Sequence, residues 1–286
     1  NLSQEISKKN NCFIIAPSDK KNFVSFEGKV KVLRTKIVNP RFKNETDYEK
    51  EKEFFRNILQ EHKTEAIIAD NMHTWVNPLT TKALLEAAKS NNVDVFLRVH
   101  NYFLDKDPTL LKLENWKKYL CVSKSVAEQI IKKGIDKKRV KVIYPPIIEE
   151  IFQPSRKKLI RKEIAIPKES LVLMQASRIV GGEKTFEEKG IPELLDIFSK
   201  IEDKKAHLII AAAKTTGENI HKMKEAIEKI KKISKEKGVY GRVHVISKDF
   251  KDMPEVYNSA DIFIMMSRIE TFGNVYAEAM ACEVPA

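Results

Sequence analysis

The sequence is poor in cysteine and has no long hydrophobic run. Its three cysteines, Cys12, Cys121 and Cys282, lie far apart in apolar stretches and form no CxxC pair. An odd number of widely spaced cysteines argues against a disulfide framework and against a metal site. We therefore expect reduced core cysteines in a cytoplasmic protein. No apolar run approaches the ~20 residues that cross a bilayer, and the chain shows no secretory signal pattern.

Acidic residues are fewer than basic ones. The 286 residues include 40 Asp and Glu against 52 Lys and Arg, which gives a net charge of +12. A basic surface favours anionic partners such as phosphorylated substrates or acidic lipid head groups, although a lysine-rich solvated surface gives the same composition. The sequence lacks a zinc-finger spacing and an aromatic RNA-binding strand, so nucleic acid is not an expected partner.

The first half of the chain alternates short apolar runs with amphipathic segments. The runs are nearly continuous in apolar residues, which is typical of parallel strands covered on both faces. We predict strands at 12–17, 29–33, 65–70, 93–99, 119–123 and 140–146 and helices at 46–62, 77–91, 108–118 and 123–133. The last helix has a Ser N-cap and Gly134 as a stop. This rhythm predicts an α/β fold with a doubly wound parallel sheet.

The stretch YPPIIEEIFQPSR at 144–156 interrupts this rhythm. Its three prolines indicate an extended linker, so we place one domain at 1–152 and another at 153–286. The basic stretch RKKLIRKE that follows is either a solvated linker or short helix, or a contact with anionic lipid.

The rhythm then resumes to the end of the chain. We predict strands at 170–177, 206–213, 242–247 and 261–267 and helices at 191–201, 218–238, 253–260 and 273–282. The sequence therefore predicts two α/β domains.

The closing segment RIETFGNVYAEAMACEVPA carries the most chemistry. Gly273 opens a helix beyond the carboxyl end of a strand, where open α/β sheets bind ligands. A helix N-terminus offers free N–H groups and a positive dipole to a phosphate. Glu270 and Glu278 accept hydrogen bonds only, which suits sugar or ribose hydroxyls. An ordinary acidic helix start gives the same spacing.

Two cations and two histidines also follow predicted strands or precede helices. Arg178 and Lys189 could clamp a diphosphate, or they are ordinary surface cations. His100 and His73 could each face a cleft at a strand end and position a proton, or serve only the structure.

These segments together resemble glycosyltransferase family 4, the retaining group 1 transferases. SRIETFGNVYAEAMACEVP matches the glutamate–seven–glutamate signature of that family, and SR…KGIPELLDIF is similar to its donor-phosphate segment. CVSKSVAEQIIKKGIDKKRVKVIYPPI resembles the end of its first domain. The resemblance implies a GT-B fold, with two Rossmann-like domains facing a cleft.

The resemblance also implies the function and the site. A retaining, metal-independent hexosyltransferase would move a sugar from a nucleotide-sugar donor to a glycan or lipid-linked acceptor, without a cofactor. Glu278 would hold the ribose. His100 would contact the transferred sugar. Glu270 would hold the sugar and diphosphate with the main chain of the helix start, at Phe272, Gly273, Asn274 and Val275. Arg178 and Lys189 would neutralise the leaving diphosphate, with Lys184 as the rival of Lys189.

Apart from the rivalry between Lys184 and Lys189, the chain departs from the family pattern in three places. Glu283 stands where the family usually has Gly, the first strand with its glycine-rich loop is missing, and the elements that normally follow the closing proline are absent. We therefore expect a fragment truncated at both ends, with an incomplete C-terminal domain and little or no activity of its own.

Three other functions fit the same residues. These are a sugar-nucleotide epimerase, a glycogen or starch synthase, and a non-catalytic protein that binds sugar nucleotides or an anionic surface. The basic surface makes a peripheral position at the inner face of a membrane an alternative to a purely cytoplasmic one.

Overall fold

The computed structural model consists of two compact α/β units, an N-terminal unit (residues 1–146) and a C-terminal unit (147–286). The structure describes residues 13–17, 23–27, 30–35, 48–73, 78–101, 109–155, 158–177, 183–213 and 219–286. The division falls within the proline-rich stretch, shortly before the boundary expected after residue 152.

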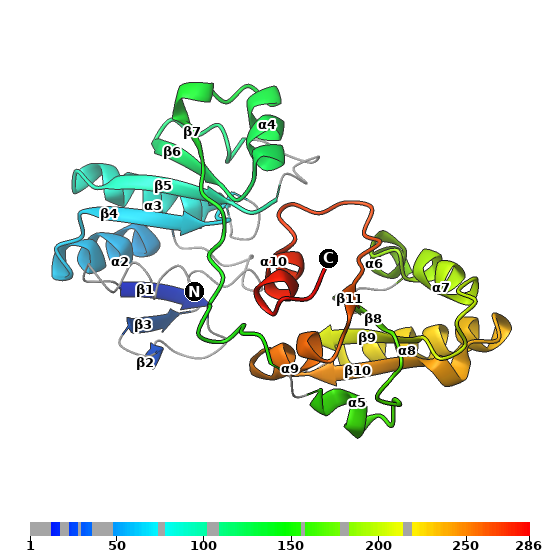
Figure 1. Cartoon of the computed structure of the whole chain (residues 1–286). Helices are drawn as coiled ribbons and strands as arrows, with labels where there is room; N and C mark the ends of the chain where they lie inside the picture. The colour runs from blue at the N-terminus through cyan, green and yellow to red at the C-terminus, as the bar shows by residue number, and fades with distance from the viewer. Residues whose placement is uncertain are drawn as a thin grey trace. The chain divides into compact units, whose positions relative to one another are not determined.

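The N-terminal unit contains two sheets (Figure 1). One has the order β1-β3-β2, in which β3 pairs with β1 in parallel and with β2 antiparallel. The other has the order β4-β5-β6-β7 and is entirely parallel. The strands are β1 (Phe13–Pro17), β2 (Phe23–Glu27), β3 (Val30–Thr35), β4 (Ala66–Asp70), β5 (Asp94–Val99), β6 (Trp116–Cys121) and β7 (Val140–Val142).

The described residues of this unit include the helices α2 (Tyr48–Glu61) before β4, α3 (Pro78–Ser90) between β4 and β5, and α4 (Lys124–Lys132) between β6 and β7, with the 3₁₀ turn η1 (Lys137–Arg139) before β7. The start of α4 follows the predicted cap, because the Ser123 side chain accepts a hydrogen bond from the Val126 N–H. Gly134 follows the helix with a φ of 96°, as a helix stop requires.

The helix predicted at 108–118 is wrong. Trp116 and Tyr119 belong to β6 and are almost fully buried. The Trp116 indole N–H donates to the carbonyl of Leu110, and the Tyr119 hydroxyl donates to that of Leu111. These tertiary contacts fix the two aromatic residues in a strand, which local periodicity does not reveal. The antiparallel strand β2 was also not predicted.

The C-terminal unit contains one parallel sheet with the order β10-β9-β8-β11. Its strands are β8 (Val172–Ala176), β9 (His207–Ala213), β10 (Val243–Lys248) and β11 (Ile262–Phe263). Two buried apolar clusters pack against the sheet, one around Met174, Tyr257 and Phe263 and another around Leu195 and Phe198. The strand predicted at 261–267 is only two residues long in the structure, because the chain leaves the sheet after Phe263.

The helices of this unit are α5 (Leu159–Glu163), α6 (Glu183–Glu188), α7 (Ile191–Ser199), α8 (Asn219–Glu236), α9 (Met253–Asn258) and α10 (Asn274–Ala281), with the 3₁₀ turns η2 (Tyr240–Arg242) and η3 (Phe250–Asp252). Helix α6 was not predicted. The basic stretch RKKLIRKE contains the short helix α5, in agreement with its interpretation as a solvated linker or short helix.

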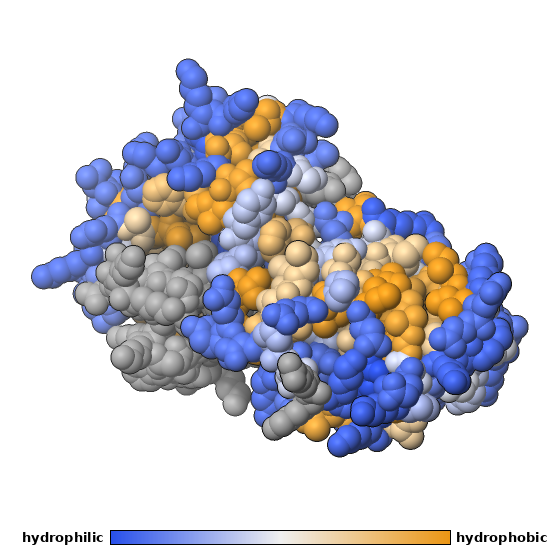
Figure 2. Space-filling view, in the orientation of Figure 1, coloured by the Kyte–Doolittle hydropathy of each residue, from blue (hydrophilic) through white to orange (hydrophobic). Residues whose placement is uncertain are grey.

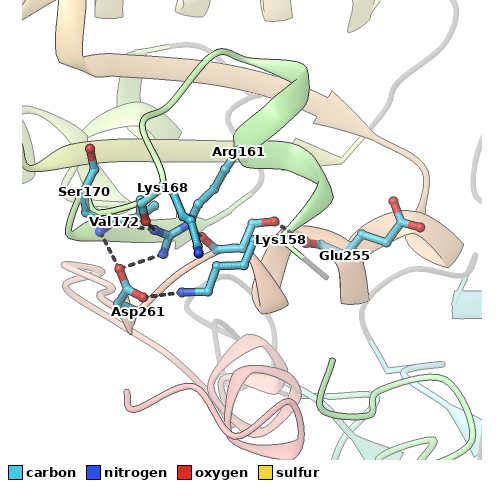
Figure 3. Close-up of polar contacts among 8 residues, drawn as sticks. Lys158, Arg161, Lys168, Ser170, Val172, Glu255 and Asp261 are labelled. Atoms are coloured by element: carbon cyan, nitrogen blue, oxygen red, sulfur yellow. Dashed lines mark hydrogen bonds and ion pairs between the residues drawn. The ribbon is translucent and has the colours of Figure 1, made fainter. Parts of the chain in front are cut away.

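Helix α5 is held by a buried arginine (Figure 3). Arg161 is 3% exposed and donates to the main-chain carbonyls of Ser259 and Ser170. Its guanidinium and the Lys158 ammonium converge on the Asp261 carboxylate at 2.7 and 2.6 Å. Arg161 is therefore enclosed in the unit and does not form part of a basic surface for lipid.

Both hydrophilic and hydrophobic residues reach the surface on the face seen in Figure 2. Large apolar side chains that are well exposed include Met280, at 65%, and Phe250, at 55%. Within the described ranges, no helix combines the length and the apolar composition needed to span a membrane.

Candidate functional site

The candidate site lies in the C-terminal unit, where the chain leaves β11 and enters α10. Gly273 caps α10 in the left-handed conformation, with a φ of 77°. A Cβ at this position would lie 2.8 Å from the ring of Tyr276, so the turn suits only glycine. The first N–H groups of a helix have no partner within it, so the start of α10 can donate hydrogen bonds to an anion.

Lys189 reaches this loop from the turn between α6 and α7. Its Nζ lies 2.5 Å from Oε1 of Glu270. Both side chains are about a quarter exposed, at 24% for Lys189 and 27% for Glu270. The structure thus places the predicted phosphate cation against the first glutamate of the signature.

Two neighbours fix the main chain at Lys189. Gly190 has a φ of 63°, and a Cβ there would overlap the main-chain carbonyl of Met266. The absence of a side chain therefore lets the α6–α7 turn lie directly against the segment that follows β11. Gln175, fully buried on β8, donates from Nε2 to the Lys189 carbonyl at 2.9 Å. Gln175 was not predicted as a site residue, although a polar residue inside an otherwise apolar strand was a visible signal.

Glu278 lies on α10, where the Tyr257 hydroxyl donates a hydrogen bond to its Oε2 at 2.7 Å. Burial raises the pKa of the Glu278 carboxyl above its ordinary value, and the hydrogen bond from Tyr257 acts in the opposite direction. Tyr257 was not predicted as a site residue.

The other predicted donor contacts surround the same helix start. Phe272 and Val275 are half-buried, and Asn274 is exposed at the first position of α10. Arg178 lies outside the described residues. Lys184 belongs to α6, but its side chain also lies outside the description.

The predicted histidines lie in the N-terminal unit, at the carboxyl ends of its parallel strands. His100 follows β5, and its Nε2 lies 2.6 Å from Oδ1 of Asp70 at the end of β4. The main-chain N–H of His100 donates to Oδ1 of the Asn71 side chain, and this hydrogen bond fixes the main chain just after β5. His73 is 3% exposed, and burial lowers its pKa to about 4.

The part of the chain that the structure describes contains no group of three or more His, Cys, Asp or Glu side chains arranged to hold a metal ion. Cys121 and Cys282 are free and buried. Burial raises the pKa of Cys121 to about 12 and that of Cys282 to about 11. Both thiols are therefore protonated and unreactive at neutral pH. Cys12 lies outside the described residues.

Part of the chain is similar to a known family of proteins. Residues 178–286 match the family model described as "Glycosyl transferases group 1". Mannosylfructose-phosphate synthase of Agrobacterium fabrum is 28% identical over 162 residues, which is 53% of this chain and 33% of that protein. The chain therefore spans about a third of the length of this curated relative.

Solved structures show the same fold. HepE of Anabaena, in complex with UDP and glucose, is 16% identical with a TM-score of 0.65, covering 90% of this chain and 66% of its own. Sucrose-phosphate synthase of Thermosynechococcus elongatus is also 16% identical, with a TM-score of 0.74, covering 99% of this chain and 72% of its own. The prediction of an α/β fold of the GT-B class is confirmed.

Proposed function

We propose that this chain, whose residues 178–286 match the group 1 glycosyltransferases, forms part of an enzyme that transfers a sugar from a nucleoside-diphosphate sugar to an acceptor. The observation that carries the proposal is the contact of Lys189 with Glu270 beside the glycine-opened start of α10. This arrangement combines a cation, the main-chain N–H donors of a helix start and a carboxylate within one loop system. Together they can hold a diphosphate and the hydroxyls of a sugar.

The reaction breaks the bond between the anomeric carbon and the diphosphate oxygen. The nucleoside diphosphate leaves with the bonding electrons, the acceptor oxygen bonds to the anomeric carbon, and the acceptor proton passes to the departing phosphate. We propose that this occurs with retention at the anomeric carbon and that Lys189 and Arg178 supply the positive charge which stabilises the leaving group. The contact with Glu270 favours Lys189 over Lys184 for this role.

The carboxylates and His100 have separate proposed roles. Glu270 and the main chain at Phe272, Gly273 and Asn274 would hold the sugar and diphosphate, and Glu278 would hold the ribose. Val275 would contribute its main chain to the same seat. His100, oriented by Asp70, would contact the transferred sugar.

The donor is proposed to be a nucleoside-diphosphate sugar because HepE, a protein of the same fold, is known in complex with UDP-glucose. The acceptor would be a glycan or a lipid-linked glycan. The net charge of +12 is compatible with a peripheral position on an anionic membrane surface. Sedimentation with anionic liposomes at low salt tests this position, since binding should weaken as salt rises.

Nucleotide binding tests the seat directly. The protein is screened by thermal unfolding with UDP, GDP, ADP and their sugar conjugates. A ligand at 100 times its dissociation constant adds about 2.7 kcal/mol of stability. We expect one base to give a clear shift. No shift with any of these nucleotides would overturn the proposed function.

Catalysis is tested with Glu270→Gln in the full-length protein to which this chain belongs, because the substitution keeps the size of the side chain and removes its charge. Sugar transfer should fall roughly 100-fold or more, while liposome binding should not change. Glu163→Gln is a matched control, because Glu163 makes a surface ion pair with Lys248. A non-catalytic sugar-nucleotide binder would instead show no transfer in the unmodified full-length protein to which this chain belongs.

A further inference from the structure

Tyr257 on α9 is a buried tyrosine whose hydroxyl is directed at a carboxylate of the proposed site. It is fully buried and donates to Oε2 of Glu278 at 2.7 Å. The two residues come from different helices, α9 and α10. A tyrosine hydroxyl in a core needs a hydrogen-bond partner, and here that partner is a glutamate rather than a main-chain carbonyl.

The ring of Tyr257 is held on two sides. Its centroid lies 6.0 Å from that of Phe152 and 5.9 Å from that of Phe263. Helix α9 itself is fixed to the start of the unit, since Asn258 donates to the Gln153 carbonyl and accepts from the Ser155 N–H. The hydroxyl therefore occupies a fixed place, and it restricts the carboxylate that accepts from it.

The second oxygen of Glu278 remains available. In the described part of the chain, the Glu278 carboxylate has one side-chain hydrogen bond, and Oε2 accepts it. An ionised carboxylate has about four acceptor positions on two oxygens. Oε1 can therefore accept hydrogen bonds from a ligand while Oε2 stays bound to Tyr257.

The hydrogen bond also affects the charge of Glu278. The side chain is half-buried, and this burial favours the protonated acid. Tyr257 donates to the ionised form and opposes the effect of burial. Cys282 also lies near Glu278, and its protonated thiol carries no charge at neutral pH. Without the Tyr257 hydroxyl, Glu278 would be a poorer acceptor for hydroxyl groups.

We propose that Tyr257 is a positioning residue for nucleotide recognition, which fixes one oxygen of Glu278 and directs the other to the ribose hydroxyls of the donor. The proposal rests on the proposed function, because it assigns the ribose to Glu278. It adds that the preference for a ribonucleotide depends on a residue that does not touch the ligand.

The test compares a nucleoside diphosphate with its 2′-deoxy and 3′-deoxy analogues by titration calorimetry. The probe is whichever of UDP, GDP and ADP stabilises the protein most. In the unmodified protein, one deoxy analogue should bind roughly 10- to 100-fold more weakly, the effect of losing a hydrogen bond to a charged group. In Tyr257→Phe, this ratio should fall to a few-fold or less.

Tyr119→Phe is the matched control. Its hydroxyl is also buried and donates at 2.6 Å, but to the Leu111 carbonyl in the other unit. Both variants should lose thermal stability, and only Tyr257→Phe should lose the ratio. The double variant Tyr257→Phe/Glu278→Gln should discriminate no worse than Glu278→Gln alone, because Tyr257 acts through Glu278.

The possible failures differ from one another. If the unmodified protein binds no nucleoside diphosphate, the proposed function fails together with this inference. If it binds one but shows no deoxy discrimination, or if Tyr257→Phe keeps the full ratio, the nucleotide seat stands and the role of Tyr257 is refuted.

Discussion

The Nζ atom of Lys189 lies 2.5 Å from Oε1 of Glu270, although 81 positions separate the two residues. Each partner neutralises the other in a partly buried place, so neither charge is left uncompensated. A diphosphate that bound here would compete with Glu270 for the lysine. The carboxylate would then be free to accept from a sugar hydroxyl.

Lys189→Met should weaken binding of the preferred nucleoside diphosphate. We expect its dissociation constant to rise roughly 10- to 100-fold, because a charge-assisted contact is lost. Titration calorimetry measures the change. Lys200→Met is the control, since Lys200 pairs with Asp196 on an exposed surface. Equal affinities in Lys189→Met and the unmodified protein would exclude Lys189 from the phosphate seat.

Gly190→Ala should destabilise the C-terminal unit strongly. The new Cβ would overlap the Met266 main chain, which cannot move as a flexible side chain would, and φ is 63°. The combined cost is about 3 kcal/mol or more. Gly238→Ala separates the two causes, because Gly238 has a φ of 68° but no atom within 4 Å of the new Cβ. We expect it to cost only about 1 kcal/mol. Thermal unfolding followed by circular dichroism gives both values, and similar losses would contradict the role of the Met266 contact.

Much of this fold could be predicted from the sequence, because parallel strands and helix caps leave local signals. Ser123 and Gly134 mark the ends of α4 correctly. Trp116 fits a helical pattern in the sequence but lies in a strand, since its partner is the carbonyl of Leu110 and not a helical neighbour. Spacing could also not distinguish Lys189 from Lys184, because the contact with Glu270 depends on how the α6–α7 turn packs.

Glu283→Gly should stabilise the protein. Glu283 follows α10 with a φ of 58°, and the Val284 N–H donates to the Ala279 carbonyl in a Schellman motif. The left-handed conformation costs a glutamate about 1 kcal/mol, and glycine avoids this cost. The melting temperature should therefore rise. Glu225→Gly, at an exposed position within α8, should lower it by a similar free energy. A fall in both variants would show that the Glu283 side chain stabilises the turn.

His73 should make the stability of the folded protein decrease as the pH falls. Burial lowers the pKa of His73 in the folded protein to about 4, below the ordinary 6.5 of the unfolded chain. Between these two values the unfolded state binds the proton and the folded state does not. The stability is therefore complete above pH 6.5 and decreases by about 3 kcal/mol in total as the pH falls to 4.

Urea unfolding at several pH values measures this effect. His73→Leu should flatten the dependence between pH 6.5 and 4. An unaltered slope in His73→Leu would mean that other groups cause the acid sensitivity.

The contacts of α5 have a consequence for the order in which the chain folds during synthesis. Arg161 and Lys158 bond to Ser259 and Asp261, which follow them by 98 and 103 positions. A ribosome adding about 5–20 residues per second needs roughly 5–20 s to cover that distance. Throughout this interval the arginine has no counterion and cannot be buried. We therefore expect nascent chains that end before Asp261 to be cut by protease around α5, and chains that extend well beyond it to resist.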